Sequence, residues 1–195
     1  MLVTHGSDGA PIPSHPSDYP CIDLVNSRFS DYLGGEGVTD RLRSPEWQAW
    51  FLERHELTPD DGAGAPVVRL EGLRRDLRRI LETWARHRAL SRRDGDVLDA
   101  WTRGAHLRQR VTVSRGEARL ELEAVTRNWD WAVATIAASA AGVMAGGDPH
   151  RLKVCSNPGC SWMYYDTTLN GSKRYCSTTP CGSLVRVRRF RSADG

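Results

Sequence analysis

Apolar residues recur at three- and four-residue steps across residues 67–87, which is the spacing of an amphipathic helix. Arginines occupy the other side of this segment. Two shorter helices are indicated by their starts, where Ser44 precedes Pro45 and where Ser91 is followed by Asp94 three residues later. The first two thirds of the chain is therefore predicted to be mostly helical.

The period changes to two after these helices. Apolar and polar residues alternate over residues 111–113 and again over residues 118–124, with Ser114-Arg115-Gly116-Glu117 between them. Alternation on either side of a short glycine-containing segment predicts a β-hairpin. The short apolar segment over residues 20–27 is too short for its periodicity to distinguish a helix from a strand.

Residues 129–145 are nearly free of charge, with Asp130 as the exception. A membrane helix needs about 20 strongly apolar residues, whereas this segment is shorter and rich in alanine. We therefore expect a buried helix, capped by Asn128, in a soluble domain with no membrane contact. Residues 1–18 contain no apolar stretch of the signal-peptide type, so a loose tail and a cytoplasmic location are expected.

The cysteines are the most specific chemical signal. Four of the five lie in the last forty-one residues as Cys155-x4-Cys160 and Cys176-x4-Cys181, with fifteen residues between the pairs. Each pair can supply two thiolates to a tetrahedral metal site, and turn-forming residues fill both gaps. Disulfides or an iron–sulfur cluster are the alternatives. In a reducing cytoplasm this pattern favours one structural Zn²⁺ with four sulfur ligands and no catalytic position.

The segment between the two cysteine pairs reads as a strand over residues 162–165, a turn at Asn170-Gly171 and a return over residues 173–175. A module this small lacks the core to fold alone, so the metal should contribute on the order of 10 kcal/mol. The predicted fold class is α+β. It comprises a mostly helical N-terminal domain with a β-hairpin, then a small zinc ribbon or zinc finger followed by a short basic helix.

Charge divides along the chain. From Arg151 onward the chain has eight basic residues and two acidic ones, Asp166 and Asp194, so this part carries a charge of +6. Because the net charge of the whole chain is +3, the residues before Arg151 carry −3. A basic module on a mildly acidic body indicates a polyanionic partner such as DNA. The candidate nucleic-acid contacts are Lys173, Arg174, Arg186, Arg188, Arg189 and Arg191.

The cysteine module resembles the CGNR-type zinc finger proteins of bacteria. The resemblance rests on the following residues: Leu152, Lys153, Val154, Cys155, Pro158, Cys160, Trp162, Tyr165, Asp166, Thr167, Ser172, Arg174, Cys176, Cys181, Gly182, Arg188, Arg189 and Arg191. Residues 22–27 also resemble the opening motif of these proteins. The resemblance implies an N-terminal ABATE domain that senses a ligand in a stress-induced transcription regulator, over residues 19–147. It also implies a zinc finger over residues 150–195 that binds DNA.

The sequence departs from the family pattern directly after the last cysteine. The family has Gly-Asn-Arg, whereas this chain has Gly182-Ser183-Leu184. The arginine replaced by Leu184 is a candidate phosphate or base contact in the family. Ser183 could cap the final helix as asparagine would, so the fold is expected to persist.

Other residues allow functional and purely structural interpretations. Asn26 is interpreted as a helix cap, and Cys21 as a small buried apolar residue. Four tryptophans on three predicted helices could line a ligand pocket, although core packing is the commoner role: Trp84, Trp101, Trp129 and Trp131. No nucleophile motif, phosphate loop or catalytic metal triad occurs, so an enzyme is not expected.

The function predicted is a DNA-binding transcriptional regulator whose N-terminal domain senses a small-molecule effector or forms a homodimer. Two alternatives remain open. A zinc ribbon can dock a protein, here through Leu184, Val185, Val187 and Phe190. It can also contact RNA, with Trp162, Tyr164 and Tyr165 as stacking faces.

Overall fold

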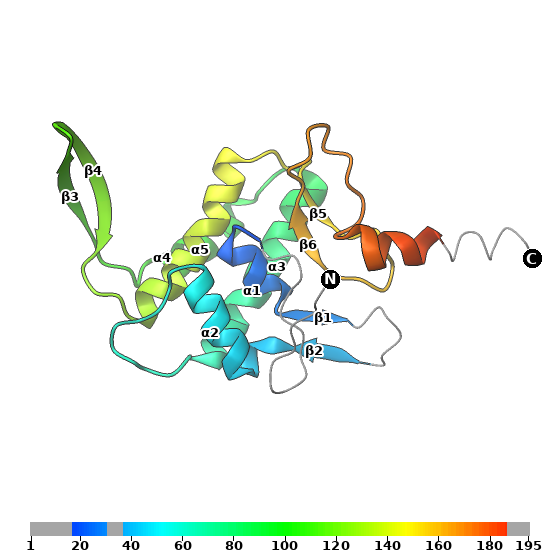
Figure 1. Cartoon of the computed structure of the whole chain (residues 1–195), viewed down its shortest axis with the longest axis horizontal. Coiled ribbons are helices and arrows are strands. Elements are labelled where there is room, and N and C mark those ends of the chain that lie inside the picture. The colour runs from blue at the N-terminus through cyan, green and yellow to red at the C-terminus, as the bar shows by residue number, and fades with distance from the viewer. Residues whose placement is uncertain (1–16, 31–36, 187–195) are drawn as a thin grey trace, which may run out of the picture.

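The computed structural model describes residues 17–30 and 37–186, and the expected tail over residues 1–18 lies almost wholly outside this part. A helical body occupies the centre of the molecule, a β-hairpin projects from one side, and the cysteine module lies on the other (Figure 1). The helices are α1 Pro20–Asn26, α2 Pro45–Arg54, α3 Val67–His87, α4 Arg92–Thr102 and α5 Trp129–Gly146, with a 3-10 turn η1 at Arg41–Arg43. The strands are β1 Arg28–Ser30, β2 Val38–Asp40, β3 Leu107–Ser114, β4 Glu117–Ala124, β5 Leu152–Val154 and β6 Met163–Tyr165.

The core lies where α1, α3 and α5 pack together. Its fully buried side chains include Leu24 of α1, Leu77 and Ile80 of α3, and Ile136 of α5. Alanines on α5 allow this helix to lie close to its neighbours, which explains why an uncharged segment belongs in the body. The prediction of a buried helix there is confirmed, and no helix in the described part of the chain is long and apolar enough to cross a membrane.

The predicted helix starts are confirmed by their hydrogen bonds. The Ser44 hydroxyl accepts from the Trp47 amide, and the Asn128 side chain accepts from the Trp131 amide at 3.0 Å. Ser91 and Asp94 form the reciprocal capping box, in which each side chain accepts from the other's backbone amide. These bonds satisfy amide groups that the first turn of a helix leaves without partners.

The ambiguous segment over residues 20–27 is a helix that begins at Pro20 and ends at Asn26. It leads into the short antiparallel pair β1–β2. Arg74 of α3 holds this pair by donating to both carboxylate oxygens of Asp40 at 2.6 Å and to the Ser27 hydroxyl at 2.8 Å.

The hairpin β3–β4 is longer than the alternation predicted, because its first strand begins at Leu107. Its tight turn places Arg115 and Gly116 at φ 52° and 82°, the left-handed conformation that such turns require. One face of the hairpin is apolar and more than half exposed, with Val111 paired across the strands to Leu120. The other face is charged, and Arg108 and Arg110 both donate to Glu123 there.

The cysteine module shares its core with the helical body. Leu152 of β5 and Met163 of β6 are buried in the same apolar cluster as α1 and α3. The side chain of Asn26 hydrogen-bonds the backbone of Met163, so the interpretation of Asn26 as a helix cap is wrong. A polar residue that follows an apolar run can cap a helix or hydrogen-bond a distant segment, and only the tertiary contact shows which of these roles it has.

Candidate metal centre and nucleic-acid interface

The first cysteine pair lies in the loop that joins β5 to β6. These strands pair antiparallel, with Val154 opposite Met163. The Cys155 amide donates to the Trp162 carbonyl at 2.9 Å, and the Cys160 amide donates to the Asn157 carbonyl at 2.8 Å. The loop therefore closes on itself and directs both sulfur atoms to one side.

The second pair lies at the start of the C-terminal helix. Cys176 precedes a π-helical turn, η2 Thr178–Gly182, which carries Cys181, and the helix continues through residues 183–186. The Gly182 amide donates to the Ser177 carbonyl at 3.2 Å within this turn. A hairpin and a helix start, separated in sequence, thus each contribute two sulfurs.

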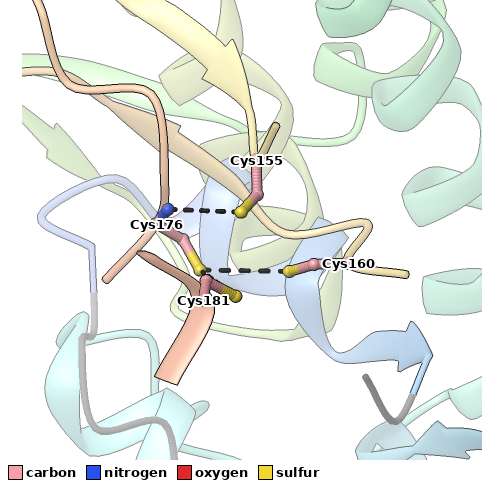
Figure 2. A group of neighbouring side chains, drawn as sticks. All are labelled: Cys155, Cys160, Cys176 and Cys181. Atoms are coloured by element: carbon pink, nitrogen blue, oxygen red, sulfur yellow. Dashed lines mark hydrogen bonds between the residues drawn. The ribbon is translucent and has the colours of Figure 1, made fainter. Parts of the chain in front are cut away.

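All four cysteine side chains converge on one point (Figure 2), and their sulfur atoms lie within 4.8 Å of one another. Cys176 Sγ lies 3.9 Å from Cys160 Sγ and 3.6 Å from Cys181 Sγ. Tetrahedral zinc with Zn–S bonds of about 2.3 Å separates its sulfurs by about 3.8 Å, whereas a disulfide joins them at about 2.05 Å. The thiols are free and buried, so the arrangement fits one structural zinc and contradicts disulfides.

Polar groups around the cluster suit it to hold thiolates. The Cys176 amide donates to Cys155 Sγ at 3.4 Å, and the Asn157 side chain donates to Cys181 Sγ at 3.6 Å. Such bonds orient metal ligands and favour their ionised form.

A buried ion pair holds the loop between the two cysteine pairs. The Asp166 carboxylate is fully buried and accepts from Lys153 Nζ at 2.7 Å, from the Lys173 amide at 2.9 Å and from the Thr168 amide at 3.0 Å. Burial alone would raise the pKa of Asp166, but the bonds from Lys153 and Thr168 outweigh it and lower the pKa well below its usual range.

The hairpin turn predicted at Asn170-Gly171 is a turn in the structure, where the Gly171 amide donates to the Thr168 carbonyl at 3.1 Å and Gly171 has φ 58°, but it joins no pair of strands in the described part of the chain. The predicted return strand over residues 173–175 is wrong, because β6 pairs with β5 and residues 173–175 form no strand. The Lys173 amide donates to the Asp166 carboxylate, so this backbone group is not available for pairing with a neighbouring strand. The backbone at Lys173 is nevertheless fixed, since its carbonyl also accepts from the Tyr164 hydroxyl at 2.9 Å.

The basic residues of the module divide into structural and exposed ones. Lys153 is bound to Asp166, and Arg151 donates to the carbonyls of Asp166 and Thr168 at 2.8 and 2.7 Å, so their charges are used inside the fold. The candidate contacts Lys173, Arg174 and Arg186 are exposed. The other three candidates, Arg188, Arg189 and Arg191, lie outside the described residues.

A basic groove of about 390 Å³ runs between the end of α3 and the module. It is lined by Arg86 and Arg88 on one side and by Lys173 and Arg174 on the other, and Glu82 is the acidic residue among the lining residues described. Arg86 Nη2 lies 3.6 Å from Glu82 Oε2, and the side chain of Arg86 is 70% exposed. Sequence reasoning missed Arg86, in the last turn of α3, and Arg88, which directly follows that helix. The basic residues at the end of the predicted helix were the signal that could have indicated them.

Comparison with known families agrees with this architecture. The model described as "ABATE: Putative stress-induced transcription regulator" matches residues 18–147, more than half of the chain. The chain belongs to the ABATE family. The model described as "CGNR zinc finger" matches residues 151–193, which contain all four cysteines of the cluster. The resemblance to CGNR-type proteins with an ABATE domain is therefore confirmed, as is the α+β fold class. No curated protein matches the chain.

Three remaining residue interpretations have clear outcomes in the ABATE domain and the CGNR finger. Ser183 follows η2 inside the helical segment, and its hydroxyl donates to the Thr178 carbonyl at 3.3 Å, so its predicted role as a cap is wrong. Cys21 is buried as predicted, and burial raises the pKa of its thiol to about 12. The tryptophans serve packing: Trp84 is buried in the core, and Trp101 donates to Asp76 at 3.0 Å.

Proposed function

We propose that the chain is a DNA-binding transcription regulator in which the CGNR finger contacts DNA and the ABATE domain senses a small molecule. The observation that carries the proposal is the basic groove, in which Arg86, Arg88, Lys173 and Arg174 meet. Cationic side chains on a fixed backbone suit phosphate groups, because their charges are already gathered before binding. Both matched families are of regulatory or zinc-finger type, and we assign the protein no catalytic role.

The zinc ion has a structural role in this proposal. Its four sulfur ligands leave no open position for substrate or water. By fixing Cys176 and Cys181 to the β5–β6 loop, the metal would hold the C-terminal helix and Arg186 in place. The candidate contacts Arg188, Arg189 and Arg191 follow directly in sequence.

Two observations favour DNA over the alternatives. RNA stacking would need open aromatic faces, but Tyr164 is buried beneath Lys173 Nζ, which lies 4.9 Å from its ring centre. Trp162 packs against Phe29 with ring centres 5.9 Å apart. A protein-docking patch would need exposed apolar residues, but Val185 is buried and Leu184 is half-buried. The other two residues of that patch, Val187 and Phe190, lie outside the described residues.

We further propose that the hairpin β3–β4 joins two copies of the chain. An isolated two-stranded hairpin is marginally stable in water, so we expect its apolar face to be buried against another surface. Val111, Val113, Leu120 and Leu122 are 63–72% exposed on that face. The opposite face is already ion-paired through Glu123, so the cover need not supply charge. An identical apolar face satisfies these conditions across a twofold axis.

The test of DNA binding is the salt dependence of affinity for labelled duplex DNA. The quadruple variant Arg86→Ala, Arg88→Ala, Lys173→Ala and Arg174→Ala should bind more weakly, and its slope of log K against log salt should be shallower by about 0.9 for each lost phosphate contact. The control variant Arg103→Ala, Arg119→Ala removes two exposed arginines at the hairpin end of the molecule and should bind like the parent. Equal slopes for parent and quadruple variant would contradict the proposal.

A further inference from the structure

A second pocket, of about 590 Å³, lies between β1–β2 and α3. This volume is in the range of small-molecule sites. Its basic lining residues are Arg28, Arg74, Arg75 and Arg78, and its acidic ones are Asp40 and Glu71. Four arginines against two carboxylates leave the lining with a charge of +2.

Both acids are held by arginines, and Arg78 is itself ion-paired with Glu82, which does not line the pocket. The charges left available are therefore those of Arg28 and Arg75. Asp40 is held by Arg74 through two hydrogen bonds. Burial raises the pKa of Asp40, but the bonds from Arg74 outweigh it and lower the pKa, so the carboxylate is ionised and bound. Glu71 accepts from Arg43, which does not line the pocket, at 3.0 Å. Arg28 lies opposite Asp40 across β1–β2, and its charge also lowers the pKa of Asp40. Asp40 is nevertheless bound by Arg74 and Glu71 by Arg43, so the pocket keeps a positive charge.

Arg28 and Arg75 are the two arginines best placed to bind a ligand. Both are exposed, and their guanidinium groups make no hydrogen bond or ion pair with any other residue in the described part of the chain. A guanidinium binds carboxylate or phosphate through two parallel hydrogen bonds. These two residues lie on different elements, β1 and α3, so a bound anion would bridge them.

The pocket also has an apolar side. Val25, Phe29 and Val38 line it, and Val38 is 55% exposed although it is a strand residue with a large apolar side chain. The Arg41 guanidinium lies over the ring of Phe29 at 4.3 Å, which fixes that ring. A ligand with an apolar body would cover Val38 while its acidic group met the arginines.

The same pocket adjoins the zinc-binding loop. Ser161, which lines it, follows the zinc ligand Cys160 directly, and the next residue, Trp162, packs on Phe29. We propose that this pocket binds a small organic anion with an apolar body, and that it is the effector site of the regulator. This inference gives a chemical class to the sensing role in the proposed function, and so rests on it. A ligand here would touch the domain that senses and the loop that holds the metal.

The test is calorimetric titration of the zinc-loaded full chain, without DNA, against benzoate, phenylacetate and phenyl phosphate, with benzyl alcohol as the neutral control. At least one anion should bind, and the neutral alcohol should not. The double variant Arg28→Ala, Arg75→Ala should lose at least about tenfold in affinity, because each arginine supplies a charged hydrogen bond. The variant Arg103→Ala, which changes an arginine outside the pocket, should bind like the parent.

Absence of binding by all three anions, or equal affinity in the double variant, would overturn the inference. Preference for phenyl phosphate over the two carboxylates, or the reverse, would identify the acidic group that the site takes. Because DNA is absent from this experiment, its failure is separate from a failure of DNA binding, which the salt-dependence measurement detects.

Discussion

The side chain of Asn26 makes both hydrogen bonds that its carboxamide can make with the backbone of Met163. Its Nδ2 donates to the Met163 carbonyl at 2.7 Å, and its Oδ1 accepts from the Met163 amide at 2.8 Å. Both residues are buried, and 137 positions separate them in sequence. Asn26 thus pairs with β6 as a neighbouring strand would, and it fastens the CGNR finger to the first helix of the ABATE domain.

Asn26→Ala should destabilise the protein strongly. The substitution leaves the buried amide and carbonyl of Met163 without partners, at a cost of about 1–3 kcal/mol each, so we expect a loss of about 3 kcal/mol in the free energy of unfolding. Urea denaturation measures this loss, and hydrogen exchange at the Met163 amide should accelerate. Asn170→Ala, which changes an exposed turn in the same finger, is the control and should cost less than about 1 kcal/mol. Equal effects of the two substitutions would show that Asn26 does not fasten the domains.

Zinc content should follow the four clustered cysteines alone. The parent and Cys21→Ser should each contain one zinc per chain, because Cys21 lies in the core away from the cluster. Cys160→Ser should lose the metal and with it stabilisation on the order of 10 kcal/mol in the finger. Metal analysis by mass spectrometry and thermal melting with and without chelator measure both quantities. Retention of full zinc by Cys160→Ser would contradict the assigned ligand set.

Asp94 should make stability depend on pH in the acid range. Hydrogen bonds from Ser91 and from Arg79, at 2.6 Å, lower the pKa of Asp94 from 3.8 to about 2. A lowered pKa in the folded state means that the carboxylate stabilises the fold above pH of about 4 and loses this effect as the pH falls toward about 2. At pH 7 the free energy of unfolding of the parent should therefore be about 2 kcal/mol larger than that of Asp94→Asn.

Urea denaturation of both proteins across this pH range measures the difference in their free energies of unfolding. This difference should vanish as the pH approaches about 2. Asp96→Asn changes an exposed carboxyl on the same helix and should stay within about 0.5 kcal/mol of the parent at pH 7. A difference between parent and Asp94→Asn that does not depend on pH would show that the lost charge is not its cause.

Val111→Asp should dissociate the dimer that we propose. A carboxylate at the centre of the apolar hairpin face would be buried without a partner in the dimer and solvated in the monomer. Light scattering should give the parent twice the chain mass of 21.7 kDa, and the variant that mass once. Thr112→Asp lies on the opposite face, where it pairs with Arg119, and should remain dimeric. A monomeric parent would rule out the hairpin as a dimer contact.

The local features of this fold could be predicted because they depend on neighbours in sequence. The caps at Ser44, Ser91 and Asn128 and the helix over residues 67–87 need only local hydrogen bonds and a regular apolar spacing. The cysteine cluster could be predicted because tetrahedral coordination restricts both the spacing of its ligands and their type. Cys21 could be judged buried because a lone thiol behaves as a small apolar group.

The errors arose where distant residues decide the outcome. The sequence favours a helix cap at Asn26, but the side chain of Asn26 bonds to Met163 in the finger. The pattern of the cysteine module predicts a return strand over residues 173–175, but the Lys173 amide donates to the Asp166 carboxylate instead of to a strand. The net charge of the tail counted Arg151 and Lys153 as available, whereas the structure uses both inside the fold. The basic groove cannot be predicted from the finger's sequence, because Arg86 and Arg88 come from the end of α3 and the residue after it.

The most direct measurement of the central claim is a selection of the zinc-loaded protein against random duplex DNA. The variant Arg186→Ala, Arg188→Ala, Arg189→Ala, Arg191→Ala is carried through the same rounds, with Arg103→Ala, Arg119→Ala as the control. We predict that the parent and the control enrich a sequence motif. The variant that lacks the four C-terminal arginines should not enrich this motif. No enriched motif, with only weak salt-sensitive binding that the quadruple variant shares, would contradict the assignment as a DNA-binding regulator.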